Sequence, residues 1–211
     1  MGSLEDLSVI IPVGPEDSSW KTLIKELSEL PKKSEICFVA TQPLEAAEEK
    51  IINEFSFHRK VQWIVGPRGR AKQLNLGVQR TKGKFLWFLH SDSRFEKKTL
   101  LSLGPALEKN PFDLLFFNLK FDSDGPGLTF INNIGVWVRS NILQMPFGDQ
   151  GMALSRLRFE ELGGFREDVS YGEDHLFVWK ARQRGVEVRS TGSSLVTSAR
   201  KYKNHGWTRT T

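Results

Sequence analysis

One acidic group follows an apolar run near the middle of the chain. Phe85 to Leu89 is entirely apolar and ends at the polar group His90-Ser91-Asp92-Ser93. A carboxylate in such a position can hold a hard divalent cation, which takes oxygen ligands and often bridges substrate phosphates. It can equally cap a helix near Phe95 or close a turn. The position of Asp92 alone favours neither interpretation.

A second acidic group, Glu173-Asp174, lies between Gly172 and His175 at the predicted start of a helix. A carboxylate there can act as a general base if it lies within hydrogen-bond reach of the proton that it takes. Consecutive helical side chains point about 100° apart, so we expect one to face a cleft and the other to be solvated or capping. Acids also favour a helix start because of the helix dipole, and this structural interpretation is favoured on these residues alone.

Basic residues concentrate in two segments. Arg68 to Gln73 lies at a predicted helix start, where N–H groups and cations could bind a diphosphate, although a solvated loop is favoured on these residues alone. The segment 189–211 contains basic residues and no acid, and it could cover a phosphate group, touch anionic lipid or remain a solvated end. No dinucleotide-binding or P-loop glycine pattern occurs in the sequence.

The elements that must position these groups alternate between strands and helices in the first half. We expect strands at 7–13, 35–40, 61–65 and 85–89, and helices at 20–30, 43–55 and 71–83. This order predicts a doubly wound α/β sheet, in which ligands bind beyond the carboxyl ends of the strands. Asp92 would lie at that edge.

In the second half of the chain, strands and helices no longer alternate regularly. We expect, in order, a helix at 97–109, a half-buried strand at 114–121, a turn at 122–127, an amphipathic helix at 130–142, a loop at 146–150, a short strand at 152–154 and a helix at 172–185. The length of 211 residues predicts one domain.

Composition excludes several classes. The 39% hydrophobic content excludes a disordered chain, and the lone Cys37 excludes a disulfide framework and a cysteine-based zinc site. The start of the chain lacks a signal-peptide or lipidation pattern and no apolar run could span a bilayer, so we expect a cytoplasmic protein. The net charge of +5 is compatible with phosphate ligands, and nucleic acid is the least favoured partner because basic and aromatic residues do not interleave.

Six motifs in order give the sequence a family resemblance. It resembles the family 2 glycosyltransferases with the GT-A fold, and within them a subgroup associated with arsenosugar biosynthesis that also carries an element similar to Thr197-Ser198-Ala199-Arg200. The motifs are Leu7 to Val13, Gly69 to Asn75, Phe88 to Ser93, Pro146 to Gly151, Glu161 to Phe165 and Gly172 to Asp174.

The resemblance implies an inverting enzyme that moves a sugar from a nucleotide-diphosphate sugar to an unidentified hydroxyl acceptor, with Mg²⁺ or Mn²⁺ as cofactor. It implies Asp174 as the catalytic base and Asp92 as the metal ligand. The implied donor-binding residues are Pro12, Val13, Glu16, Arg70, Gln73, His90, Ser91 and Asp92. The implied acceptor-side residues are Gly148, Asp149, Gln150 and Glu173, with Arg200 and Trp207 in a lid. The nucleotide-binding half would be about 1–95 and the acceptor-side half about 96–211.

The sequence also departs from the family pattern. Pro15-Glu16 replaces the common Asn-Glu after the first strand, and His90 stands where many members have the first acid of the metal motif. Relatives generally continue beyond Trp207, so an acceptor or peripheral membrane-contact element is expected to be missing. Two alternatives stay open: a nucleotidyltransferase, although its glycine-rich first loop is missing, and a non-catalytic sugar-nucleotide-binding module, suggested by the incomplete metal motif.

Overall fold

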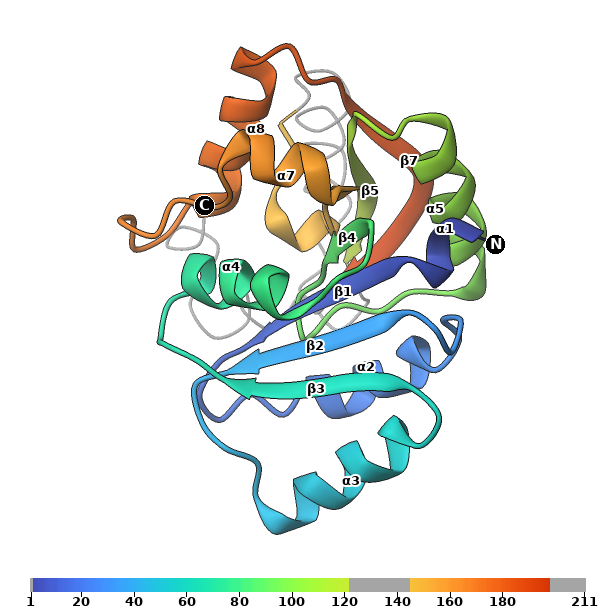
Figure 1. Ribbon diagram of the computed structural model, residues 1–211, viewed down its shortest axis with the longest axis vertical. Helices are drawn as coiled ribbons and strands as arrows, with labels where there is room; N and C mark the ends of the chain where they lie inside the picture. The colour runs from blue at the N-terminus through green and yellow to red at the C-terminus, as the bar shows by residue number, and fades with distance from the viewer. Residues whose placement is uncertain (1, 122–144, 198–211) are drawn as a thin grey trace.

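Seven strands form one sheet in the order β3-β2-β1-β4-β6-β5-β7 (Figure 1). The computed structural model describes residues 2–121 and 145–197. β6 is antiparallel to both neighbours, and the other adjacent strands pair in parallel, which confirms the expected α/β class. The strands are β1 (Leu7–Val13), β2 (Glu35–Ala40), β3 (Lys60–Val65), β4 (Phe85–Phe88), β5 (Leu114–Phe121), β6 (Ala153–Ser155) and β7 (Val188–Thr197).

Helices cover both faces of the sheet (Figure 1). One apolar core packs under α2 (Trp20–Leu27), α3 (Ala46–Ser56) and α5 (Lys97–Lys109). The other packs under α4 (Arg70–Arg80), α7 (Arg156–Leu162) and α8 (Glu173–Gln183). The short helices α1 (Gly2–Glu5) and η2 (Gly148–Gln150) complete the described helices.

The first strand shows why the sheet is buried on two sides. Successive side chains of a strand point to opposite faces. Val9 and Ile11 therefore enter the core under α2, whereas Ile10 enters the core under α4. The uninterrupted apolar run that predicted this strand is explained by this double burial.

The second half of the sheet differs from expectation at two strands. The prediction of a half-buried strand at 114–121 was wrong for Leu114 to Phe117, which are all buried, because β5 lies inside the sheet with cores on both faces. The basic segment predicted from Arg189 onward begins instead within β7, and Arg189 Nε lies 2.8 Å from Asp113 Oδ2. The turn and helix expected at 122–142 lie outside the described residues.

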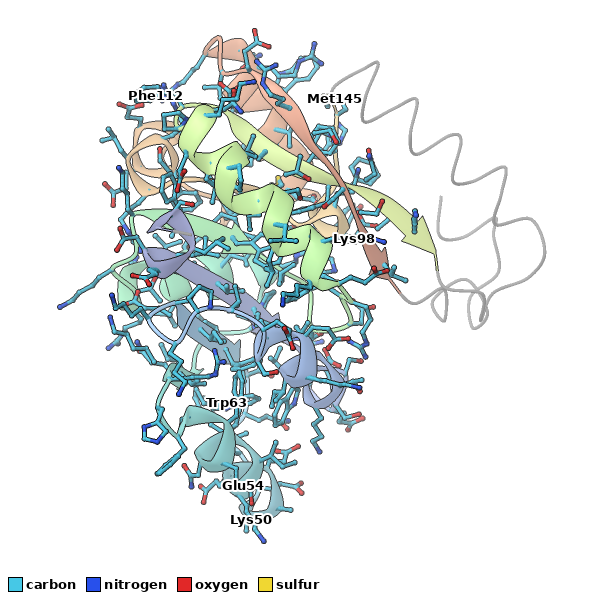
Figure 2. All side chains as sticks on the ribbon, turned by 90° about the vertical axis from the view of Figure 1, so that its right-hand side faces the viewer. Lys50, Glu54, Trp63, Lys98, Phe112 and Met145 are labelled. Carbon is cyan, nitrogen blue, oxygen red and sulfur yellow. The ribbon has the colours of Figure 1, made fainter. Side chains whose placement is uncertain are left out.

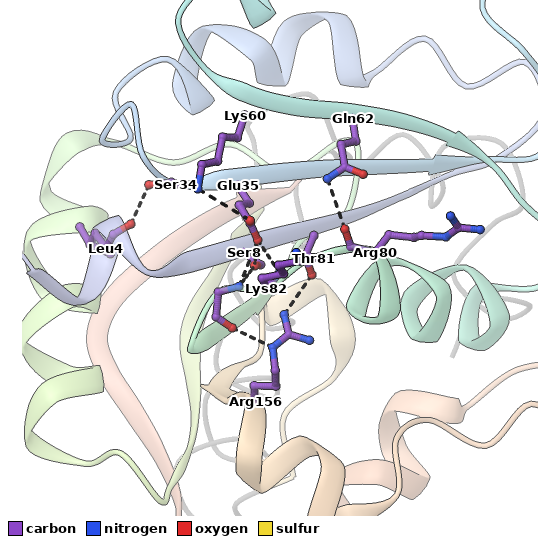
Figure 3. A network of polar contacts seen from close by, with 11 residues as sticks. Leu4, Ser8, Ser34, Glu35, Lys60, Gln62, Arg80, Thr81, Lys82 and Arg156 are labelled. Atoms are coloured by element: carbon purple, nitrogen blue, oxygen red, sulfur yellow. Dashed lines mark hydrogen bonds and ion pairs between the residues drawn. The ribbon is translucent and has the colours of Figure 1, made fainter.

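A polar network joins the amino ends of the strands (Figure 3). The Oε2 atom of Glu35 accepts hydrogen bonds from the Ser8 hydroxyl at 2.8 Å and from the N–H groups of Lys82 at 2.7 Å and Gly83 at 3.0 Å. Burial alone raises the pKa of Glu35, but these hydrogen bonds outweigh it and lower the pKa below its ordinary value. The network fixes the turn that leads from α4 into β4.

None of the helices in the part of the chain that the structure describes is both long enough and apolar enough to span a bilayer.

Candidate functional site

Asp92 lies just beyond the carboxyl end of β4, as its position after an apolar run predicts. The backbone continues the sheet for one more residue, because Leu89 N–H donates to the Ile10 carbonyl at 3.1 Å. A turn then follows, in which Ser93 N–H donates to the His90 carbonyl at 3.1 Å. Helix α5 begins only at Lys97, with Glu96 as its N-cap. Asp92 therefore forms part of a turn and does not cap the helix.

Arg70 connects the two segments that carry the acidic residues singled out by the sequence. Its Nε atom lies 3.1 Å from Glu173 Oε1, and its Nη2 atom contacts His90 Nε2. Arg70 is the first residue of α4, Glu173 is the first residue of α8, and His90 follows β4. The start of two helices and the end of one strand thus meet around one guanidinium group.

Glu173 is buried, with 5% of its surface exposed. The expectation that the partner of Asp174 would be solvated or capping was therefore wrong. A buried carboxylate needs a compensating charge, and the nearby Arg70 supplies it. This ion pair links the start of α4 to the start of α8.

Asp174 is held by two backbone N–H groups. Its Oδ2 atom accepts a hydrogen bond from Gly148 N–H at 2.6 Å, and its Oδ1 atom accepts one from His175 N–H at 2.8 Å. A Cβ atom added to Gly148 would lie 2.9 Å from Asp174 Oδ2 and would also overlap the guanidinium group of Arg70. A larger residue at position 148 would therefore have to displace one or both of these side chains.

Two predicted site residues, Gln73 and Gln150, use their amides inside the protein. Gln73 Nε2 donates to the Val13 carbonyl at 2.9 Å and the Val39 carbonyl at 2.6 Å. Gln150 Nε2 donates to the Phe117 carbonyl at 3.0 Å, and the residue is fully buried. These contacts tie α4 to the ends of β1 and β2, and η2 to β5.

The loop after β1 contributes a residue that sequence reasoning missed. Asp17 Oδ2 accepts a hydrogen bond from the Ser91 hydroxyl, and Asp17 Oδ1 accepts one from Ser19 N–H at 2.9 Å. The signal was present, because Asp17 also follows a buried strand, as Asp92 does. The resemblance instead directed attention to Glu16, which is exposed and has a left-handed backbone with φ of 59°.

A cavity of about 330 Å³ opens beside the carboxyl ends of β1 and β2. The predicted residues Val13 and Glu16 line it, and Pro12 precedes them as a half-buried residue. Trp63 and Gln42 also line it and were not predicted, because nothing in their local sequence indicates that they converge with β1. The hydrogen bond between Asp17 and Ser91 connects the wall of this cavity to the turn that carries Asp92.

The donor atoms near Asp92 fit a cation that is shared with a substrate. In residues 2–121 and 145–197, no three His, Cys, Asp or Glu side chains gather into a group that could hold a metal ion. His90 Nδ1 lies 3.9 Å from Asp92 Oδ1, and a guanidinium group, which only donates hydrogen bonds, contacts the other nitrogen of this ring. One half-buried carboxylate suits Mg²⁺ or Mn²⁺, which often take few protein ligands and complete their shell with phosphates and water.

Four predicted site residues are still to be placed: Ser91, Asp149, Arg200 and Trp207. Asp149 is half-buried in η2, next to Gly148. Ser91 is buried, with 7% of its surface exposed. The predicted lid residues Arg200 and Trp207 lie outside the described residues. The structure therefore brings Arg70, His90, Glu173 and Asp174 together around Gly148, with Asp92 at the edge of this cluster.

Comparisons with solved structures reveal the same fold in two glycosyltransferases. TarS residues 1–349 from S. aureus align with a TM-score of 0.73 and 18% identity over 91% of this chain and 60% of that chain. Another crystal structure of TarS 1–349 contains UDP-GlcNAc and aligns with a TM-score of 0.70 and 18% identity, over 91% of this chain and 58% of that chain. The mannosyltransferase PcManGT from Pyrobaculum calidifontis, in complex with GDP-Man and Mn²⁺, aligns with a TM-score of 0.70 and 19% identity over 96% of this chain and 59% of that one.

These similarities establish the GT-A fold, and the chain spans about 60% of the length of the first of these structures. A search of curated proteins finds no match. The family model described as "Glycosyl transferase family 2" matches residues 8–155, which is more than half of the chain and includes β1 except its first residue, β4 and Asp92. The chain belongs to glycosyl transferase family 2.

Proposed function

We propose that the chain is an inverting glycosyltransferase that moves a sugar from a nucleotide-diphosphate sugar to a hydroxyl acceptor, with Mg²⁺ or Mn²⁺ as cofactor. The observation that carries the proposal is the position of Arg70 between the two acidic groups. The guanidinium group contacts His90, two residues before Asp92, and Glu173, the residue before Asp174. A cation between a metal-binding turn and a base suits a diphosphate leaving group.

The donor binds across residues of the nucleotide-binding half, about 1–95. Its nucleoside occupies the cavity bordered by Pro12, Val13 and Glu16, and its diphosphate lies toward Arg70 and Asp92. The hydrogen bond from Ser91 to Asp17 supports this arrangement, because it joins the cavity wall to the Asp92 turn. Solved structures of the same fold contain UDP-GlcNAc in one case and GDP-Man with Mn²⁺ in another.

Asp174 acts as the general base. The acceptor hydroxyl attacks the anomeric carbon, the bond from that carbon to the diphosphate oxygen breaks, and the hydroxyl proton passes to Asp174. Attack opposite the departing nucleoside diphosphate inverts the anomeric configuration. Hydrogen bonds from Gly148 N–H and His175 N–H orient the carboxylate and still leave it lone pairs that can accept the proton.

Charge on the departing diphosphate requires compensation. A divalent cation held by Asp92 would supply Lewis-acid stabilisation of that charge when it is bound. Arg70 supplies a second, permanent positive charge, and the buried carboxylate of Glu173 positions it. His90 accepts from Arg70 and thereby fixes the guanidinium group toward the turn.

The acceptor enters beside η2. Gly148, Asp149 and Glu173 belong to this side, and Gln150 holds η2 against β5 through its bond to the Phe117 carbonyl. Arg200 and Trp207 belong to a lid over the donor, and the basic end of the chain makes peripheral contact with a membrane surface. Within the family, the chain belongs to the arsenosugar-associated subgroup that its sequence resembles.

The products distinguish this function from its alternatives. A panel of nucleotide-diphosphate sugars should be incubated with Mn²⁺ and alcohol acceptors, and the released nucleoside diphosphate and the glycoside should be measured by mass spectrometry. Equal amounts of both products support the proposal. Release of pyrophosphate from a nucleoside triphosphate and a sugar phosphate would identify a nucleotidyltransferase, and tight donor binding without turnover would identify a binding module.

A further inference from the structure

The cavity beside β1 and β2 has an aromatic wall and a polar rim. Trp63, labelled above α3 in Figure 2, forms part of the wall and packs on Trp20 with ring centroids 5.0 Å apart. The indole Nε1 of Trp63 donates to the Gln42 carbonyl at 3.3 Å, which fixes the ring. At about 330 Å³, the cavity lies at the small end of the range for small-molecule sites and suits the base portion of a nucleotide.

The charged side chains that line the cavity, which form its rim, are mostly hydrogen-bond acceptors. Its charged lining residues are four carboxylates and one ammonium group: Glu16, Asp17, Glu45, Glu48 and Lys21. Lys21 Nζ forms an ion pair with Glu48 Oε1 at 2.9 Å, so the one cation of this lining is already compensated. Ionised carboxylates only accept hydrogen bonds. The cavity therefore favours a ligand edge that donates.

The carboxylates of the rim differ in their existing contacts. Asp17 already accepts from the Ser91 hydroxyl and from Ser19 N–H, and Glu48 accepts from Glu45 N–H at 3.1 Å as well as pairing with Lys21. Glu16 adjoins Asp17 and lines the cavity from an exposed position, and it takes no part in the contact between Asp17 and Ser91. Of the two acids in this loop, Glu16 is thus the one better suited to a ligand edge.

We propose that this cavity selects a guanosine diphosphate sugar, with the Glu16 carboxylate accepting hydrogen bonds from N1–H and the exocyclic amino group of guanine. This inference rests on the proposed function and names its donor class. Guanine places two adjacent donors on one edge, which matches the two oxygens of a carboxylate. Such bidentate pairs discriminate strongly between bases.

The other common bases fit this rim less well. Uracil offers one N–H between two carbonyl oxygens, and those oxygens would face carboxylates. Adenine offers an amino group next to a ring nitrogen that only accepts. Carboxylates penalise a base that presents acceptors to them, because two facing acceptors cannot form a hydrogen bond. The solved structures of this fold include both a uridine and a guanosine donor, so the fold alone does not determine the base.

The test is calorimetric titration of the full chain with GDP, UDP and inosine diphosphate, each in the presence of Mn²⁺. GDP should bind about tenfold or more tightly than UDP. Inosine diphosphate lacks the exocyclic amino group, so its affinity should fall about tenfold below that of GDP. This ligand comparison needs no variant and therefore does not depend on how a mutant folds.

Two variants assign the contact. Glu16→Gln should weaken GDP about tenfold while changing UDP little, because it removes the charge and one acceptor. Glu54→Gln, on α3 outside the cavity lining and labelled in Figure 2, is the matched control and should leave both affinities unchanged. Melting temperatures verify that both variants fold.

The outcomes separate this inference from the proposed function. Equal or tighter binding of UDP would overturn the guanosine assignment and leave the glycosyltransferase proposal intact. An unchanged ratio of GDP to UDP affinity in a folded Glu16→Gln variant would overturn the role of Glu16. Failure of every nucleoside diphosphate to bind would overturn the proposed function and this inference together.

Discussion

The Asp174 carboxylate accepts a hydrogen bond from the backbone N–H of Gly148 at 2.6 Å. The two residues are far apart in the sequence, and the contact joins the start of α8 to the 3-10 helix that follows residue 147. Because Gly148 also packs against Arg70, the proposed base and the proposed diphosphate-binding cation share one neighbour. The roles of the two side chains therefore have to be tested by separate substitutions.

The first prediction concerns the base. Asp174→Asn should lower turnover about 10²- to 10⁴-fold, because a general base contributes that factor, while donor affinity changes little. Steady-state transfer rates and calorimetric donor binding measure the two effects. Asp168→Asn, an exposed acid paired with Arg166, is the control. Near-normal turnover in a folded Asp174→Asn variant would remove Asp174 from the mechanism.

The second prediction concerns the metal. Asp92→Ala should abolish the part of nucleoside diphosphate affinity that depends on Mn²⁺. This carboxylate would hold a cation whose other ligands come from the diphosphate and from water. Electron paramagnetic resonance of Mn²⁺ should reveal weak binding to the protein alone and stronger binding once nucleotide is added. Glu96→Gln, in the same loop, is the control. Donor affinity that a chelator leaves unchanged would exclude the metal role.

The third prediction concerns Arg70 and Glu173. Arg70→Met should lower the free energy of unfolding by about 1–3 kcal/mol, because it leaves a buried carboxylate without its charge partner; the half-exposed position of Arg70 reduces the full effect. The double variant Arg70→Met/Glu173→Met should lose less stability than the two single variants together. Urea unfolding at neutral pH measures the free energies of unfolding of wild type and the three variants. Strict additivity of the two single losses would show that Arg70 and Glu173 are not coupled.

The fourth prediction uses the lowered pKa of Glu35. The folded pKa lies below the ordinary value of 4.5, so the unfolded chain binds the proton more tightly. The stabilisation from Glu35 is therefore present above about pH 4.5 and is lost as the pH falls through the folded pKa. Glu35→Gln should be less stable than wild type at pH 7, and the difference should shrink below pH 4.5 in urea unfolding. If the difference in the free energy of unfolding between wild type and Glu35→Gln does not change with pH, this assignment is contradicted. Glu54→Gln is the control for the loss of one carboxylate.

The sequence predicts most of the fold because apolar periodicity records burial. The run at β1 and the helical spacing of α5 give these elements their observed bounds, Leu7–Val13 and Lys97–Lys109. β7 escaped prediction because its serine, threonine and glycine content is typical of a loop. Its strand conformation depends on parallel pairing with β5, from Leu114 opposite Val188 to Phe121 opposite Thr197, and local sequence does not encode that partner.

The positions of Asp92 and Asp174 were predictable, because each lies in a short segment that follows a strand or begins a helix, whereas their roles stay predictions. Sequence reasoning did not find that Glu173 would be buried against Arg70, because that contact requires α4 and α8 to meet. It also missed Asp17 as the partner of Ser91, which depends on the folded position of the loop after β1. Local sequence patterns do not reveal which distant segments come into contact in the folded chain.

The most direct test of the proposed glycosyltransferase function is a thermal-shift panel of nucleotide-diphosphate sugars with Mn²⁺ and with a chelator. A donor at about 100 times its Kd should stabilise the chain by roughly 2.7 kcal/mol, which corresponds to a rise in Tm of roughly 5–10 °C for a protein of this size. At least one donor should raise the Tm by this amount, and the rise should be larger with Mn²⁺ than with chelator. If no nucleotide sugar raises the Tm under either condition, the proposed glycosyltransferase function is contradicted.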